Sequence, residues 1–271
     1  MPDTVSTTSL LAMFSTLVLS ILFPVVLWLA VRRQDKKATL AVIAGAIGFI
    51  IPQMVVRLPL LQLLGRQPDW VFFLSTRRVF ALVFYPLTAA LVETAGRLAV
   101  LGVVLKKRRS FYAALGAGIG HGGAESIGLI GLTYINNIIL SVLINRGTLP
   151  NLAGLEEALT ALRETAPLLF LMAGVERVLV LPLQIALTVL LAAFWQRGRL
   201  FAGILCCAGL HFAVDLVAVF MSSQQMSLWL IEGFLLLVAL LSIWLIFRQR
   251  KWFGEMAIPD DEAEQAVREG Y

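Results

Sequence analysis

Charged residues are scarce in this chain of 271 residues: only 14% are Asp, Glu, Lys or Arg, whereas 59% are hydrophobic. Soluble domains carry about 25% charged residues, and their mean hydropathy lies far below the +0.86 of this chain. Cysteine occurs only at Cys206 and Cys207, and because neighbours on a helix point to different faces, this pair predicts neither a disulfide nor a metal site. The composition excludes an ordinary soluble domain and indicates an integral membrane protein.

Seven apolar runs are long enough for the roughly 20 residues that a helix needs to cross a bilayer. They cover residues 9–31, 39–57, 77–105, 111–133, 167–194, 200–222 and 227–247. Helices are expected because backbone polar groups in lipid must bond within their own segment. The predicted fold class is an all-α, polytopic transmembrane helical bundle. One membrane domain is expected over residues 1–250, followed by a polar cytoplasmic tail over 251–271.

Two stretches depart from this pattern. Residues 134–145 are too few to span a bilayer after a helix that ends near residue 133, so they predict a short re-entrant or interfacial segment. Beyond Pro150, leucines recur at helical spacing with charged residues on the other faces. They are Leu152, Leu155, Leu159 and Leu162. This pattern predicts an amphipathic helix on the outer surface.

Basic residues gather in short loops after the first, third, fifth and seventh predicted spans. By the positive-inside rule these loops are cytoplasmic, which predicts an outer N-terminus, a cytoplasmic C-terminus and a multi-pass protein of the plasma (inner) membrane. Arg66, Arg77 and Arg78, in an outer connection, are the exception. Because the loops account for the formal net charge of +5, that charge does not indicate a nucleic-acid partner. The expected partners are the lipid bilayer and a membrane-embedded peptide or protein.

Four of the predicted spans carry pairs of ionisable residues, although one charge at a helix centre costs about 2.5–3.5 kcal/mol on insertion scales. The pairs are Glu93 with Arg97, His121 with Glu125, Glu176 with Arg177, and His211 with Asp215. Three of them have i, i+4 spacing, which places both side chains on one helix face. We expect the four faces to meet in one polar chamber inside the bundle, with Gln53 and Arg57 closing it from another side. Charge pairs that merely join helices are the structural alternative.

Glycines surround the first histidine in the stretch "GAGIGHGGAE". Gly116 with Gly120, and Gly118 with Gly122, have the GxxxG spacing that allows close helix packing. The functional alternative is that these glycines leave room for a substrate backbone beside His121.

The chemistry of the pairs suits peptide hydrolysis, which needs a base to activate water and a group to hold the developing oxyanion. Glu93 suits the base, because Arg97 one turn away favours its ionised form. His121 and His211 can polarise the scissile carbonyl or hold the water, and Asp215 can fix the tautomer of His211. No cofactor is favoured, but His121, His211 and Glu125 would also make an adequate Zn²⁺ site, although an HExxH motif is absent.

The order of these motifs resembles the YhfC family of intramembrane peptidases, itself similar to the CAAX-protease, bacteriocin-immunity and PrsW group. The motifs are E-x-x-x-R from Glu93, G-H-G-G-x-E from Gly120, E-R at Glu176, and H-x-x-x-D from His211, and the resemblance covers about residues 10 to 250. In the CAAX-type relatives a glutamate activates water with the help of two histidines. The resemblance therefore implies that Glu93 is the base, that Arg97 is its arginine, and that His121, His211 and Asp215 assist.

The chain also departs from the pattern of those relatives. Val92 and Ala117 stand where a first glutamate and an aromatic residue occur, and Glu125 and Glu176 have no counterpart. Either Glu93 or Glu125 therefore stays open as the base, and so does the choice between a glutamate and a metal for activating water.

The leading hypothesis is an intramembrane endopeptidase, glutamic-type rather than metal-dependent, that cleaves a membrane-associated or membrane-spanning substrate. Its predicted catalytic residues are Glu93, His121, Glu125 and His211, and its supporting residues are Arg97, Glu176, Arg177 and Asp215. One alternative is a proton- or cation-coupled transporter or channel that uses the same residues as a relay. Another is a non-catalytic membrane protein in which the polar residues only join helices.

Overall fold

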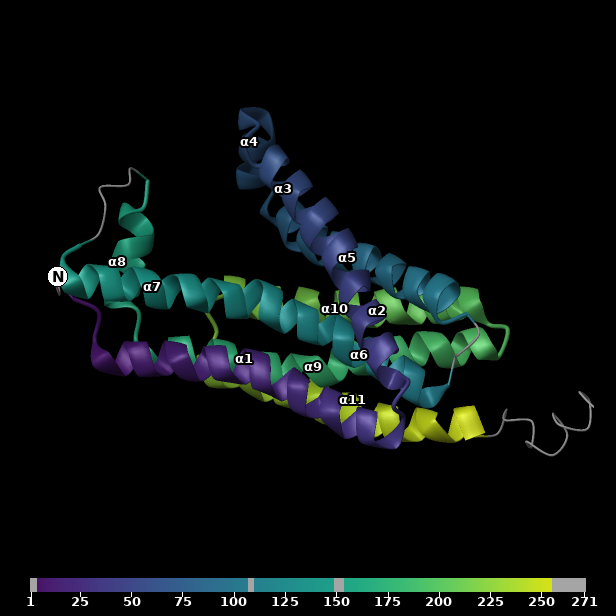
Figure 1. The fold of residues 1–271 in the computed structure, drawn as a ribbon. Coiled ribbons are helices and arrows are strands. Elements are labelled where there is room, and N and C mark those ends of the chain that lie inside the picture. Colours follow the sequence, from purple (N-terminus) through teal and green to yellow (C-terminus); the bar gives the residue numbers. More distant parts are fainter. Residues whose placement is uncertain (1–3, 107–109, 149–153, 255–271) are drawn as a thin grey trace, which may run out of the picture.

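The computed structural model describes residues 4–106, 110–148 and 154–254, and in these ranges the chain is a bundle of long helices (Figure 1). Seven helical stretches are long and apolar enough to cross a membrane, which confirms the predicted all-α bundle of seven spans. The α-helices are α1 (Thr7–Gln34), α2 (Ala38–Phe49), α3 (Leu58–Leu64), α4 (Pro68–Thr76), α5 (Arg78–Ala99), α6 (Phe111–Glu125), α7 (Leu132–Arg146), α8 (Glu156–Glu164), α9 (Pro167–Gln196), α10 (Leu200–Ser223) and α11 (Leu228–Gly254). Three π-helical segments, η1 (Ile50–Arg57), η2 (Val100–Val104) and η3 (Ser126–Gly131), continue α2, α5 and α6 without a break.

Helix α9 forms the centre of the bundle. In its most apolar 18-residue stretch 72% of the residues are buried, against 17–39% in the other six spans. It contacts α1, α6, α10 and α11, and its residues between Leu181 and Ala193 form much of the main core. Apart from Gln184 and Thr188, this stretch is apolar on all sides, as expected of a helix in the middle of a bundle.

Small residues allow the helices around this centre to approach very closely. A Cβ atom at Gly120 would collide with the backbone carbonyl of Val42 in α2, and one at Gly118 would lie 2.7 Å from the Cα atom of Ile185 in α9. Gly48 of α2 and Gly96 of α5 meet backbone to backbone in the same way. The glycine spacing therefore does allow close helix packing, because a neighbouring helix occupies the position that a Cβ atom would take at each of these glycines.

The structure corrects the prediction of a re-entrant or interfacial segment over residues 134–145. These residues belong to α7, and the run from Phe111 to Arg146 is one helical stretch of 36 residues. At 1.5 Å per residue it is about 54 Å long, more than a bilayer core of about 30 Å. It ends at Gly147, whose φ of 64° is the left-handed conformation that commonly stops a helix. The polar residues Asn136 and Asn137 therefore lie within a continuous helix and do not mark its end.

The predicted amphipathic helix is present as α8. Its Leu159 and Leu162 pack against a second core formed at this end of the bundle by α1, α7 and α9, around Met13, Tyr134 and Phe170. Leu152 lies outside the described residues, as does the predicted tail beyond Gly254, while α11 continues through residues 251–254.

Helices α3 and α4 rise away from the rest of the bundle together with the start of α5 (Figure 1). Edge-on ring contacts join α4 to α5, among them Trp70 with Phe84 at 5.3 Å and Phe73 with Phe80 at 5.1 Å between centroids. Cys206 is exposed and Cys207 is buried, and both thiols are free.

The collision at Gly120 gives a prediction for stability. Gly120→Ala should lower the free energy of unfolding by about 1–3 kcal/mol, because the added methyl group meets backbone that has no rotamer to change. Thermal unfolding of the purified protein in detergent measures the loss. Gly233→Ala in α11 is the matched control, since its Cβ atom would meet nothing within 4 Å. Equal melting temperatures for the two variants would contradict the packing argument.

Candidate active site

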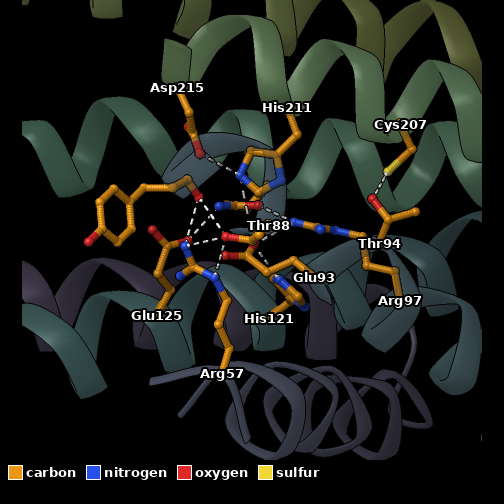
Figure 2. Close-up of polar contacts among 12 residues, drawn as sticks. Arg57, Thr88, Glu93, Thr94, Arg97, His121, Glu125, Cys207, His211 and Asp215 are labelled. Carbon is orange, nitrogen blue, oxygen red and sulfur yellow. Dashed lines mark hydrogen bonds and ion pairs between the residues drawn. The ribbon is translucent and has the colours of Figure 1, made fainter. Parts of the chain in front are cut away.

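Three helices bring their ionisable residues to one point in the interior (Figure 2). Glu93 comes from α5, His121 from α6 and His211 from α10, and their exposed fractions are only 4%, 1% and 2%. His121 Nε2 lies 3.1 Å and His211 Nε2 lies 3.9 Å from the same atom, Glu93 Oε2. Arg97, one turn further along α5, donates a hydrogen bond from Nη2 to that oxygen at 3.4 Å. One carboxylate oxygen therefore faces three nitrogen atoms.

Close helix packing explains why His121 is so deeply buried. Gly120 lets α2 approach from one side of α6, and Gly122 lets α9 approach from the other. Phe49, the last residue of α2, then lies edge-on to the imidazole, with 5.2 Å between ring centroids and an interplanar angle of 78°. The ring is held between helices, with its Nε2 atom directed at Glu93.

Asp215 lies one turn beyond His211 on α10 and approaches the same imidazole. Its Oδ2 atom is 3.3 Å from His211 Nε2, so this nitrogen faces two carboxylates. Both partners can only accept a hydrogen bond when ionised, which assigns the hydrogen to Nε2. Nδ1 is buried without a partner among the described residues. Asp215 therefore meets the nitrogen that faces Glu93, and about a third of its side chain stays exposed.

Glu125 belongs to a second cluster beside the first. Arg177 Nη1 donates to Glu125 Oε1 at 3.1 Å, and the same guanidinium lies 3.8 Å from Glu176. The amide of Gln184 in α9 donates to Glu125 Oε2 and accepts from Arg97 Nη2. Glu125 is thus compensated by a cation and an amide, whereas the two histidines lie at Glu93.

Gln184 joins the two clusters, and no sequence pattern indicated it. A neutral amide in a long apolar helix gives no charge signal, although its position seven residues after Arg177 places it on the same helix face. A Cβ atom at Gly122 would lie 2.8 Å from the Gln184 Cβ atom. The glycine that follows His121 therefore makes room for the side chain that connects Arg97 with Glu125.

Arg57, on η1, bonds to α5 close to the site. Its Nη2 atom donates to the backbone carbonyl of Tyr85 at 2.7 Å and to Thr88 Oγ1 at 3.1 Å, and its Nε donates to the same hydroxyl at 3.2 Å. Both acceptors lie on α5, one to two turns before Glu93. Arg57 therefore fastens η1 to the helix that carries the central carboxylate (Figure 2).

A cavity of about 500 Å³ adjoins the two clusters, within the range of small-molecule and peptide sites. On α10 it is lined from His211 through Asp215 to Ser222, a distance of about 16 Å at the rise of a helix. Glu93, Glu125, Glu176, Arg177, Gln53 and Gln184 also line it. The cavity reaches the last turn of α10 and the first turn of α11, at Leu228. It connects the buried carboxylate with one end of the bundle.

The donors at Glu93 match a zinc ion in type, but only one of the two histidines has the matching spacing. Zinc takes imidazole nitrogen and carboxylate oxygen, and two ligands about 2.0 Å from one tetrahedral ion lie about 3.3 Å apart. The two histidine nitrogens lie 3.1 and 3.9 Å from Glu93 Oε2. Across the described ranges, however, no group of three or more His, Cys, Asp or Glu side chains is already arranged as a metal site. Glu125, the carboxylate proposed from the sequence as a ligand, contacts Arg177 and Gln184.

The fold and the site together define a multi-pass membrane protein with a buried cluster of glutamate, histidine and arginine beside a cavity. Comparison with known proteins names the family. The sequence model of the family described as "YhfC intramembrane metalloprotease" matches residues 14–235, and the chain belongs to that family.

One curated relative is the "Uncharacterized membrane protein YhfC" of Bacillus subtilis (strain 168). The two proteins are 29% identical over 176 residues, which are 62% of this chain and 67% of that protein. No solved structure matches the chain.

The second cluster predicts energetic coupling between Glu125 and Arg177. Glu125→Gln and Arg177→Gln should each lower stability, since each leaves a partly buried charge without its partner. The double variant should lose less free energy of unfolding than the two single variants lose together, and the difference should be about 0.5–3 kcal/mol. Chemical unfolding of the four proteins in detergent measures this. The pair Glu176→Gln and Arg177→Gln is the control, with smaller coupling expected at 3.8 Å and higher exposure. Strictly additive losses for Glu125 and Arg177 would refute the coupling.

Proposed function

We propose that this protein is an intramembrane endopeptidase in which Glu93 activates the water that attacks the peptide bond. The observation that carries this proposal is the approach of both histidines of the chain to one oxygen of Glu93. The family description supports an intramembrane protease. A buried carboxylate with two imidazoles at the wall of a cavity has the groups that hydrolysis needs.

Glu93 acts as the general base in the proposed reaction. Arg97 keeps the carboxylate ionised in its buried position, so that Glu93 can take a proton from water as the water oxygen bonds to the scissile carbonyl carbon. The protonated Glu93 then gives this proton to the leaving nitrogen as the C–N bond breaks. His121 and His211 hold the water or polarise the carbonyl, and Asp215 orients His211 through Nε2.

Glu125, Glu176 and Arg177 have a supporting role in this proposal. Arg177 neutralises Glu125 at 3.1 Å. The Gln184 amide bonds to Glu125 at one end and to Arg97 at the other. Because Arg97 also contacts Glu93, this chain of contacts holds the base in place. The assignment of Glu93 as the base, with Glu125 in support, rests on the position of the two histidines.

Zinc, if it is the cofactor, would be held by His121, His211 and Glu93 and would supply Lewis-acid activation of water and of the scissile carbonyl. The position of Arg97 favours the metal-free form, because its guanidinium already compensates the carboxylate that would attract the ion. Under either assignment the same side chains hold and orient the reacting groups.

We infer that the N-terminus lies outside the plasma membrane and the C-terminus in the cytoplasm, as the basic loops indicate. The cavity would then open toward the outer side, since it ends at the last turn of α10, opposite the basic loop that precedes this helix. A membrane-associated or membrane-spanning peptide could thus present its scissile bond from that side.

Cleavage tests the proposed base. In liposomes that contain the purified protein and a panel of membrane peptides, Glu93→Gln should lower kcat about 10²–10⁴-fold, because the amide cannot accept the proton from water. His211→Ala and His121→Ala should also reduce it. Glu157→Gln on the exposed face of α8 is the control, with unchanged activity. Cleavage that survives Glu93→Gln and His211→Ala would remove the site assignment, and ion flux without any cleaved product would favour the transporter alternative.

Metal analysis tests the cofactor. We expect the purified protein to contain zinc well below one ion per chain and to keep its cleavage activity after treatment with a chelator. Elemental analysis by mass spectrometry measures the content. One zinc ion per chain, with activity lost on chelation and restored by added zinc, would overturn the metal-free assignment.

A further inference from the structure

Gln53 is a buried amide on the wall of the cavity that the proposed reaction leaves without a role. It lies on η1 with only 5% of its surface exposed, and it lines the same cavity as Glu93 and His211. Its Oε1 atom is buried without a hydrogen-bond partner, and no hydrogen bond joins its amide nitrogen to any other described residue. Buried amides are normally hydrogen-bonded, so an amide without a partner beside a cavity points to a ligand.

The position of Gln53 is fixed by the packing of η1 against α5. Five residues before it, Gly48 meets the backbone of Gly96, which lies three residues beyond Glu93. Four residues after it, Arg57 bonds to Thr88 and to the carbonyl of Tyr85. Both contacts hold η1 against the helix of the proposed base. The π-helical backbone of η1 is itself a form found frequently at functional sites.

The Nε2 atoms of His121 and His211, which can polarise the scissile carbonyl, already face Glu93 Oε2, so a further donor to the carbonyl oxygen has to come from another element. Negative charge develops on the scissile carbonyl oxygen, and a donor directed at this oxygen lowers the barrier. Asp215 is a carboxylate and would repel that charge. Arg97 and Arg57 are not among the residues that line the cavity. Arg177 does line it, but its guanidinium already contacts Glu125 and Glu176, and its remaining Nε atom is buried.

We propose that the side-chain amide of Gln53 donates a hydrogen bond to the scissile carbonyl oxygen and stabilises the oxyanion. This inference rests on the proposed function. The amide can present its nitrogen by turning about its last torsion angle, since neither of its atoms is held by a partner in the described structure. Gln53 thereby becomes a catalytic residue that acts from η1, on the cavity that His211 also lines.

Kinetics with the liposome peptide panel test this role. Gln53→Leu, which removes the amide, and Gln53→Glu, which keeps the shape and loses the donors, should each lower kcat about 10²–10³-fold with KM nearly unchanged. Gln249→Leu is the matched control: Gln249 is also fully buried, with both amide atoms unpartnered, but it lies near the end of α11. It should keep the wild-type kcat. A kcat within about threefold of wild type in Gln53→Leu, or a rise in KM alone, would overturn the proposal.

Infrared spectroscopy gives a readout that does not depend on turnover. A peptide with a ¹³C label at the scissile carbonyl is bound to the inactive Glu93→Gln protein. Its carbonyl stretch should lie at lower wavenumber when it is bound to the Glu93→Gln protein than when it is bound to the double variant Glu93→Gln/Gln53→Leu, because a hydrogen bond weakens the C=O bond. The same wavenumber in both proteins would exclude the contact with Gln53.

The two failures can be told apart in these experiments. If the wild-type protein cleaves no peptide, the proposed function fails, and the role of Gln53 fails with it. If the wild type cleaves and Glu93→Gln does not, but Gln53→Leu retains full kcat, only the role of Gln53 fails.

Discussion

Compensation of the buried carboxylate of Glu93 is the constraint on which the rest of the interior depends. Its Oε2 atom lies 3.1 Å from His121, 3.4 Å from Arg97 and 3.9 Å from His211, all within the apolar spans. A charge in that environment is tolerated only when partners surround it. Three helices must therefore present their polar faces to one point, and this requirement fixes how α5, α6 and α10 turn relative to one another.

Close packing of α2, α6 and α9 is what makes this compensation geometrically attainable. Without a side chain at Gly120 and Gly122, α2 and α9 reach the two sides of the helix that carries His121, and Gln184 can cross toward Arg97. In lipid, helices gain little from the hydrophobic effect on association, so close contact and polar bonds supply the attraction. The same glycines therefore stabilise the bundle and hold the polar chamber together.

The spans and the polar pairs were predictable because both depend on local sequence: hydropathy marks helices that must cross lipid, and ionisable residues stand out within it. The structure of residues 134–145 was not predictable in this way, because hydropathy gives the length of chain that can cross lipid but not whether the helix continues beyond that length. Gln184 was missed for a related reason. Burying an uncharged amide in an apolar helix costs less free energy than burying a charge, so its presence does not require a charged partner nearby.

The sequence by itself determined the membrane class, the seven spans, the family resemblance and the set of residues that cannot remain in lipid alone. Only the tertiary structure decided which of them meet. It placed both histidines at Glu93, and it placed Glu125 between Arg177 and Gln184. The physical reason is that spacing along one helix fixes a face but not the neighbour of that face. The neighbour depends on how closely helices distant in sequence can approach, which the packing at Gly48, Gly96 and Gly120 settles.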